Sequence, residues 1–336
     1  MSRRKILVGS AAASLGAPLI AHAQTEIGEV RIAKQYSIAD LPLTVMQELG
    51  LIERHAEREG LKGLKTSWPR FAGGAPINDA MISGNLEFAV GGVGPMVTLW
   101  ARTRGGLGVR GLAALNSIPL YLNTIRPEVA TLRDLTPKDR IALPAVRVSI
   151  QAVTLQMACE QMFGPGEHGR LDPLTVSMSH PDTHNAMLSG RSEITAHFSS
   201  PPFGNLQLQN PRIHRLLSNY DVLGGPCSST FIWTTQVVRE RNPRVYRAVF
   251  AALEEAIAFI ARHKGEAADL WLRAENSSLP REFALSLLND PEFRFTTVPE
   301  NTMKYAQFMH RTGTARENPA GWQEMFFPEI HALQGS

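Results

Sequence analysis

The sequence has 336 residues, 43% of them apolar and 19% charged, with 22 prolines, and these values describe a globular protein long enough for two domains. The formal net charge of +3 suggests a basic protein, but Arg3, Arg4 and Lys5 account for it. Without residues 1–23 the chain has 31 basic and 31 acidic residues. Binding to nucleic acid or to an anionic membrane therefore has little electrostatic support, and we expect no nucleic-acid partner.

The first 23 residues have the pattern of an export signal. A basic start is followed by an apolar run from Ile6 to Ile20 and by Ala21-His22-Ala23, which is a small-residue cleavage site. The run is short and contains Gly16 and Pro18, which argues against an uncleaved membrane anchor. We therefore expect a periplasmic protein, exported by the general or the twin-arginine route.

Strands and helices alternate along the first third of the mature chain. The expected strands are 30–33, 64–71, 86–90 and 109–115, and the expected helices are 43–49, 51–59, 77–82 and 96–102. This alternation predicts an α/β lobe with a mostly parallel sheet flanked by helices. In such a sheet, ligands bind beyond the carboxyl ends of the strands.

The same pattern restarts after an extended apolar run at 117–123. The expected elements are a helical turn at 132–135, a helix at 149–163, and strands at 140–144, 174–178, 194–198 and 213–217. A second extended run at 229–233 leads back, and the remainder is helical and expected to cover the core. We therefore predict two lobes joined by two crossing segments, one made of 24–117 plus 231–336 and the other of 118–230.

One stretch occurs twice and supports two similar lobes. Residues 80–87 (AMISGNLE) and 186–193 (AMLSGRSE) share Ala, Met, Ser, Gly and Glu in register, and each leads through an apolar segment to a proline, Pro95 or Pro201. Both copies are expected to end a helix at a glycine with positive φ, form a strand and enter a new helix near the proline.

The loops after these strands are the candidate ligand site. Gly73-Gly74 and the run 91–94 (GGVG) would let backbone approach a ligand closely, and each precedes a helix N-terminus that favours an anion. Neither has the spacing of a nucleotide-binding loop. The side chains near these loops that can stack on, pair with or orient a ligand are Tyr36, Phe71, Arg147, His180, His184, His197, Ser199 and Phe203.

Other chemistries have weaker support. His180, His184 and His197 could form a metal set, but Pro181 argues against a helix shared by the first two, so we expect no metal. Ser199 lies two residues from His197 without a third catalytic member, so a hydrolase is not favoured and we expect no enzyme activity and no cofactor. The two cysteines, 159 and 227, could form a bridge or remain buried thiols.

Several stretches resemble the nitrate/sulfonate/taurine class of ABC-transporter solute-binding proteins. They are the signal peptide, residues 80–92 (AMISGNLEFAVGG), the second-lobe start from Leu132-Arg133-Asp134-Leu135 to Ile141-Ala142-Leu143-Pro144, and the helix that opens at Asn242-Pro243. The resemblance covers nearly all of the mature chain. It implies two α/β lobes of the type II periplasmic-binding arrangement that close on a small organic anion such as a sulfonate, taurine-like compound, nitrate or carboxylate.

The resemblance also implies site residues and partners. By position, the cleft contacts of the class map onto Tyr36, Ser37, Gly73, Gly74, Val93, Gly94, Arg147, His180, His197 and Ser199. We expect a monomer that delivers its ligand to an ABC-transporter permease. A thiamine-pyrimidine-synthesis-like enzyme on the same fold and a ligand sensor remain the alternatives. The particular solute stays open.

Overall fold

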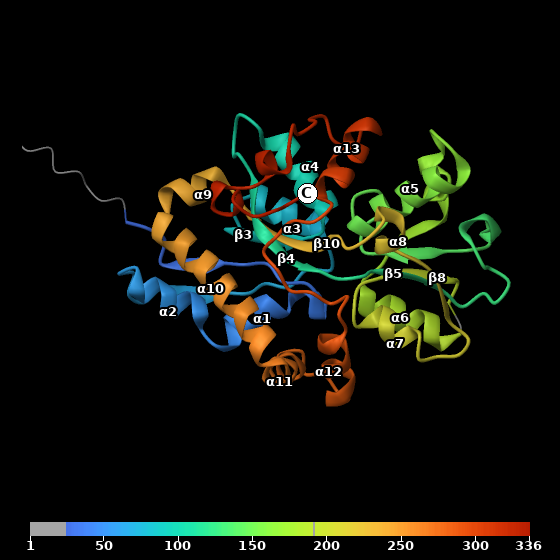
Figure 1. The fold of residues 1–336 in the computed structure, drawn as a ribbon, viewed down its shortest axis with the longest axis horizontal. Helices are drawn as coiled ribbons and strands as arrows, with labels where there is room; N and C mark the ends of the chain where they lie inside the picture. Colours follow the sequence, from blue (N-terminus) through green and yellow to red (C-terminus); the bar gives the residue numbers. More distant parts are fainter. Residues whose placement is uncertain (1–24, 191) are drawn as a thin grey trace, which may run out of the picture.

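The computed structural model describes residues 25–190 and 192–336. The expected export signal at 1–23 therefore lies outside the described residues, as does Arg191 of the second repeat. The described chain forms two lobes, which lie side by side in Figure 1. Among the described helices, none is both long and apolar enough to cross a membrane.

The first lobe is built from the N-terminal part of the chain. Its elements are β1 (Glu29–Arg31), the 3-10 helix η1 (Ile38–Asp40), α1 (Leu41–Glu48), α2 (Leu51–Arg58), β2 (Lys65–Ser67), α3 (Gly74–Ile82), β3 (Phe88–Gly91), α4 (Val93–Thr103) and β4 (Arg110–Ser117). The strands expected at 30–33, 64–71, 86–90 and 109–115 all form, although β2 is only three residues long.

The second lobe follows directly after β4. Its elements are β5 (Tyr121–Thr124), η2 (Leu132–Asp134), β6 (Ile141–Leu143), α5 (Ile150–Phe163), η3 (Glu167–Gly169), η4 (Asp172–Leu174), β7 (Thr175–Ser177), α6 (His180–Ser189), β8 (Ala196–Ser199), α7 (Phe203–Gln207), β9 (His214–Ser218) and α8 (Asn219–Leu223).

The chain then returns to the first lobe and ends in helices. These elements are β10 (Ser228–Thr234), α9 (Gln236–Arg241), α10 (Pro243–Arg262), α11 (Lys264–Ala274), α12 (Arg281–Asn289), α13 (Thr302–Arg311), η5 (Trp322–Met325) and η6 (Pro328–Ile330). Helix α10 packs on α1 and α2, and α13 contacts both α4 and α5. The C-terminal helices therefore cover the first lobe and also touch the second.

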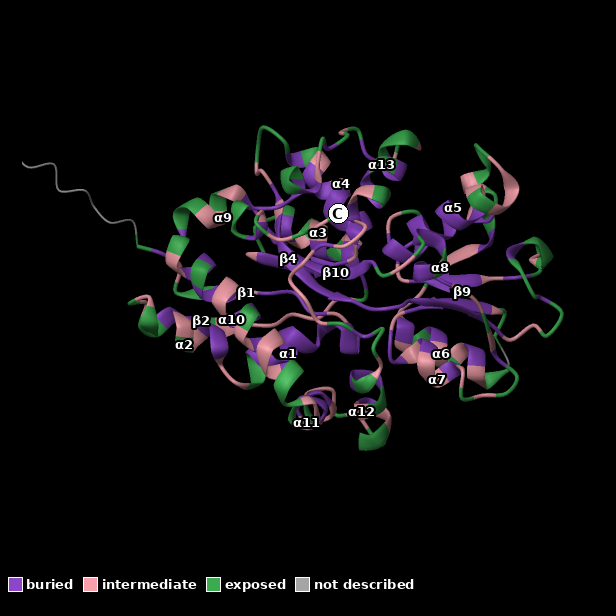
Figure 2. Cartoon of the chain, viewed as in Figure 1, coloured by how far each residue is buried: buried purple, intermediate pink, exposed green. Residues whose placement is uncertain are grey.

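The two sheets have the same strand order. The second sheet is β7-β6-β8-β5-β9, and the first is β2-β1-β3-β10-β4, because the bridge between Ile32 and Phe88 joins the β1-β2 pair to the other three strands. In each sheet one inner strand, β5 or β10, is antiparallel to its neighbours. The two extended runs expected to cross between the lobes supply these strands. All their residues are buried, as Figure 2 shows for the central strands.

The repeated stretch occupies equivalent places in the two lobes. It ends α3 and α6, and Gly84 and Gly190 follow with φ of 72° and 65°, where glycine has no steric penalty. The Ser83 hydroxyl donates to the Ala80 carbonyl, and the Ser189 hydroxyl donates to the Ala186 carbonyl. The repeat therefore ends a helix in the same way in each lobe before strand β3 or β8.

The expectation that Pro181 prevents His180 and His184 from sharing a helix is wrong. Helix α6 begins at His180, and Pro181 occupies its first turn, where a missing backbone N–H costs nothing because that group has no partner within the helix. The two histidines are one turn apart, and both pack against the Phe203 ring.

Candidate functional site

A polar cavity of about 40 Å³ lies between the two lobes, at the carboxyl ends of both sheets. The first lobe contributes Gln35, Tyr36, Ser37, Asp40, Ala72, Gly74, Gly91, Gly92, Pro95, Ser229 and Thr230. The second lobe contributes Pro144, Ser149, Ile150, Gln151, His180 and Ser200. A cavity needs roughly 10 to 15 Å³ of such space to hold one water, so this one has room for a small group of atoms.

Two helices of the first lobe begin at this cavity without a side-chain cap. The residues before α3 and α4 are Gly73 and Gly92, and no side chain accepts from the first-turn N–H groups of either helix. In contrast, Ser149 caps α5. Uncapped first turns leave backbone donors available beside the positive end of the helix dipole. This part of the cavity therefore suits a negatively charged or oxygen-rich group.

A chain of hydrogen bonds fixes the tautomers of two buried histidines. The backbone carbonyl of Gly204 accepts from Asn123 Nδ2 at 3.0 Å, and the same nitrogen donates to Gln207 Oε1 at 3.2 Å. Gln207 must therefore present its Nε2 donor to His197 Nδ1, 2.9 Å away. The His197 proton then resides on Nε2 and is donated to His180 Nδ1 at 2.8 Å.

The consequence is that His180 offers a neutral donor to the cavity. Its Nδ1 accepts from His197, so its own proton resides on Nε2. This nitrogen lies 3.4 Å from the Gln151 side-chain amide, which must then present its oxygen to the ring, because two N–H donors do not bind each other. Burial lowers the pKa of His180 to about 3 and holds the pKa of His197 well below its usual value. Both rings are therefore neutral at pH 7, and His180 lines the cavity with an uncharged ring.

Asp40 is the one carboxylate among the residues that line the cavity. It is 2% exposed and accepts from the Gln35 backbone N–H at 2.6 Å. Burial raises its pKa to about 6, partly offset by that hydrogen bond and by Lys34. Asp40 therefore changes charge as the pH passes through about 6.

No lysine or arginine lines the described cavity. Lys34 is buried behind it and donates to Thr44 and Gln47. Arg70 lies over the Tyr36 ring, 5.5 Å from its centroid, and both of its terminal nitrogens pair with Glu275 at 2.5 Å. The cavity therefore depends on neutral donors rather than on a cationic side chain.

The sequence-predicted site residues separate into three groups. Tyr36, Ser37, Gly74 and His180 line the cavity, and Gly73 adjoins it as the residue that precedes α3. Ser37 also donates from its hydroxyl to the Pro201 carbonyl at 2.7 Å, a hydrogen bond between the lobes.

Val93, Gly94 and Arg147 do not line the cavity. Val93 is fully buried, and Arg147 is exposed with a φ of 66°. A Cβ atom on Gly94 would lie 2.2 Å from the Val148 carbonyl oxygen of the opposite lobe. Gly94 therefore lets the two lobes approach each other, a different role from contact with a ligand.

His197 and Ser199 lie one layer behind the cavity. Both are buried in β8, where His197 orients His180 and the Ser199 hydroxyl donates to the Tyr121 carbonyl. The cavity residues with polar side chains that the sequence left out are Gln35, Asp40, Ser149, Gln151, Ser200, Ser229 and Thr230. Ser149 could have been found as a helix cap, and Ser229-Thr230 could have been found only by placing the crossing strand inside the first sheet.

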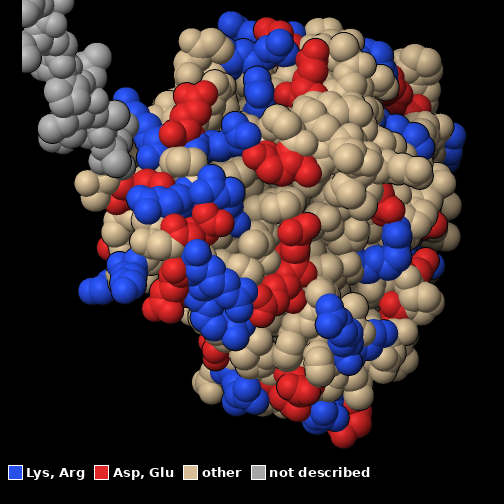
Figure 3. All heavy atoms as spheres, turned by 60° about the vertical axis from the view of Figure 1, so that its left-hand side comes forward, with Lys and Arg blue, Asp and Glu red and all other residues tan. Residues whose placement is uncertain are grey.

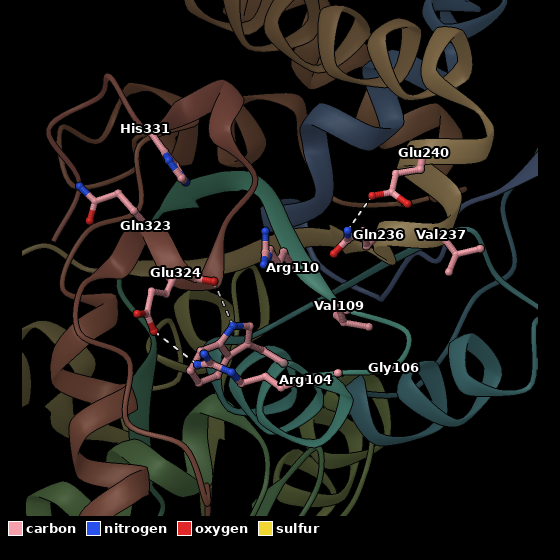
Figure 4. Close-up of a pocket in the computed structure, with 13 residues that line it drawn as sticks. Arg104, Gly106, Val109, Arg110, Gln236, Val237, Glu240, Gln323, Glu324 and His331 are labelled. Carbon is pink, nitrogen blue, oxygen red and sulfur yellow. Dashed lines mark hydrogen bonds and ion pairs between the residues drawn. The ribbon is translucent and has the colours of Figure 1, made fainter.

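A larger hollow of about 650 Å³ lies at the other end of the first lobe. Figure 4 shows its lining, in which Arg104 pairs with Glu324 and Arg110 lies near the start of β4. Strand β4 begins there and ends at the crossing, so this hollow is at the sheet edge remote from the cavity. All its residues belong to the first lobe.

The described residues offer little support for metal or nucleic-acid binding. No group of three or more His, Cys, Asp or Glu side chains in the described ranges could hold a metal ion. On the face in Figure 3, positive and negative side chains are interspersed, without a large area of one sign. Cys159 and Cys227 are both buried and free, so the thiol alternative is the one observed.

Comparison with solved structures identifies the fold. The chain is similar to the alkanesulfonate-binding protein SsuA from Xanthomonas axonopodis pv. citri bound to MOPS, with a TM-score of 0.67 and 15% identity over 88% of this chain and 96% of that one. It is also similar to the aliphatic sulphonate binding protein SsuA from Escherichia coli, with a TM-score of 0.65 and 16% identity over 90% and 92%.

The periplasmic nitrate-binding protein NrtA from Synechocystis PCC 6803 gives a TM-score of 0.68 and 14% identity over 89% of this chain and 84% of that one. No protein-family model and no curated protein matches the sequence. The chain thus has the fold of periplasmic solute-binding proteins, which confirms the fold expected from the sequence. At these identities the ligand has to be inferred from the cleft itself.

The histidine tautomers can be tested directly. Long-range nitrogen-15 to proton correlation spectra should show His180 and His197 both protonated on Nε2. Gln207→Glu replaces the donor to His197 with an acceptor, so it should move both protons to Nδ1. The exposed Gln209→Glu serves as the matched control and should leave the spectra unchanged. Protonation on Nδ1 in the native protein would contradict the assignment.

Asp40 should reduce stability at neutral pH. Its folded-state pKa, about 6, is above the usual value of 3.8, so stability falls as pH rises through this interval and the full penalty is present above pH 6. This difference between the two pKa values corresponds to about 3 kcal/mol in the free energy of unfolding. Asp40→Asn, which keeps an acceptor for Gln35, should raise the unfolding free energy in urea at pH 8 by up to about that amount. The gain should vanish near pH 3.

The exposed Asp79→Asn on α3 is the control and should change little at either pH. If Asp40→Asn raised the unfolding free energy by the same amount at pH 3, the increase would come from packing and not from the removed charge.

Proposed function

We propose that this chain is the periplasmic solute-binding component of an ABC importer, exported through the signal at 1–23, and that it captures a small organic anion between its lobes. The observation that supports it most is the cavity itself, because both lobes contribute polar groups to it at the carboxyl ends of their sheets. The structures that share this fold include sulfonate- and nitrate-binding proteins.

The donors around the cavity favour an anionic group. Gly74 at the start of α3 and Gly92 just before α4 line the cavity and provide backbone N–H groups, and His180 provides its Nε2–H from the other lobe. A sulfonate, a taurine-like compound, nitrate or a carboxylate has acceptor oxygens that could bind to both sides at once. Such a ligand would join the lobes by hydrogen bonds that neither lobe makes alone.

Closure of the lobes would bury the bound anion. In the conformation described, Ser37 donates to the Pro201 carbonyl, and Gly94 lies against Val148. We infer that an open form exchanges with this closed one and that the ligand favours the closed form by binding to both lobes. The closed face would then be the surface that the permease recognises, with the protein acting as a monomer.

A panel of small anions tests the proposed function. At pH 5, we expect at least one of four anions to bind: methanesulfonate, taurine, nitrate or acetate. Binding should raise the melting temperature of the protein and reduce its radius of gyration, measured by X-ray scattering. The affinity should fall as pH rises to 8, because ionised Asp40 repels an anion while His180 does not titrate in this range. No effect from the whole panel, or tighter binding at pH 8, would count against an anionic ligand.

Gly94→Ala tests closure separately from folding. The added methyl would overlap the Val148 carbonyl oxygen, which lies 2.2 Å from the Cβ position, so the lobes could not reach the described contact. We expect at least a tenfold loss of ligand affinity and no compaction, with each lobe still folded by circular dichroism. The exposed Gly28→Ala has free space around its Cβ and serves as the control. Normal affinity and compaction in Gly94→Ala would refute the closure mechanism.

A further inference from the structure

A second hollow adjoins the polar cavity and opens outward between the lobes. Its volume is about 540 Å³, against about 40 Å³ for the inner cavity, and the two share Tyr36 and Ser37. We call it the outer groove. The shared residues make it a continuation of the candidate site, and it is large enough for a ring system.

The walls of the outer groove are rich in aromatic and apolar side chains. Phe203 and Leu206 come from α7 in the second lobe, and Trp271 and Leu279 come from α11 and the loop that follows it in the first lobe. Tyr36 is 39% exposed, one of the few large apolar side chains that are open to solvent. Exposed aromatic surface in a concave site is a common mark of a place where an apolar group of a ligand binds.

The aromatic walls are fixed relative to the inner donor. The Phe203 ring stacks on His180 with the ring centroids 6.1 Å apart and the planes at 25°. On the opposite wall, Arg70 covers one face of Tyr36 and is itself held by Glu275, whose loop lines the groove. The outer groove therefore begins beside His180, whose Nε2–H is the donor in the inner cavity.

We propose that the physiological ligand is an aryl-bearing anion with two parts. A small acidic group enters the inner cavity, which holds only a few atoms, and an aromatic ring lies in the outer groove between Tyr36, Phe203 and Trp271. The inference rests on the proposed function, because the acidic group occupies the site described there. It adds the ring, whose contacts come from both lobes and would favour the closed form.

Matched pairs of compounds test this assignment by isothermal titration calorimetry on the full mature protein. Methanesulfonate is compared with benzenesulfonate, and acetate with phenylacetate, so that each pair keeps its head group. The aryl member of at least one pair should bind ten times more tightly or better, and its binding should change the tryptophan fluorescence through Trp271.

Phe203→Leu removes the ring but keeps an apolar side chain of similar size, so the fold should persist. It should cost the aryl compound at least fivefold more in affinity than it costs the small partner, which shares only the head group. Val237→Ala, in the remote hollow of Figure 4, is the control and should affect neither compound.

The outcomes separate the two proposals. If small and aryl anions bind equally, the two-part ligand is wrong and the proposed function stands. If aryl anions bind more tightly but Phe203→Leu has no effect, the ring does not lie in the outer groove. If no compound of either pair binds, the anion-binding function fails, and the two-part ligand fails with it.

Discussion

The exchange of one strand between the lobes is the constraint on which the site depends. Strand β5 lies inside the second sheet and β10 inside the first, and each is reached by a short crossing segment. Asn219 links the two crossings, since its side-chain oxygen accepts from the Leu120 N–H in the first and its side-chain amide donates to Cys227 Sγ in the second. Because both sheets are completed in this way, their carboxyl ends face each other, and the loops that follow the strands meet at one cavity.

Small residues in the facing loops control how near the lobes come. A Cβ on Gly92 would lie 2.7 Å from Ile150 side-chain atoms, and one on Gly94 would overlap the Val148 carbonyl oxygen. Both glycines have negative φ, so the requirement is for space and not for an unusual backbone conformation. The same absence of side chains leaves the first turn of α4 without a cap. Close approach of the lobes and available backbone donors thus follow from one sequence feature.

The fold could be predicted from the sequence to a large extent, because each lobe alternates strands and helices with clear apolar patterns. The site could be predicted less well. Loops such as Gly73-Gly74 lie beside the cavity, but sequence position does not show which loop residues face inward. His197 lies behind His180 because strand side chains alternate between faces. Asp40 was missed because a single acidic residue before a helix is usually a cap, and only the fold shows that it is buried in the cleft.

The charge balance of the cleft determines what kind of selectivity it can have. Neutral donors recognise an anion by direction and distance, so a cleft without lysine or arginine discriminates by geometry more than by charge. Asp40 strengthens this effect, because its ionised form repels any anion that fails to make enough hydrogen bonds to compensate. An arginine in the same place would bind many anions tightly and release them slowly. Under the function proposed above, the protein passes its ligand to a permease, and the moderate affinity that this requires is what neutral donors and a buried carboxyl group together supply.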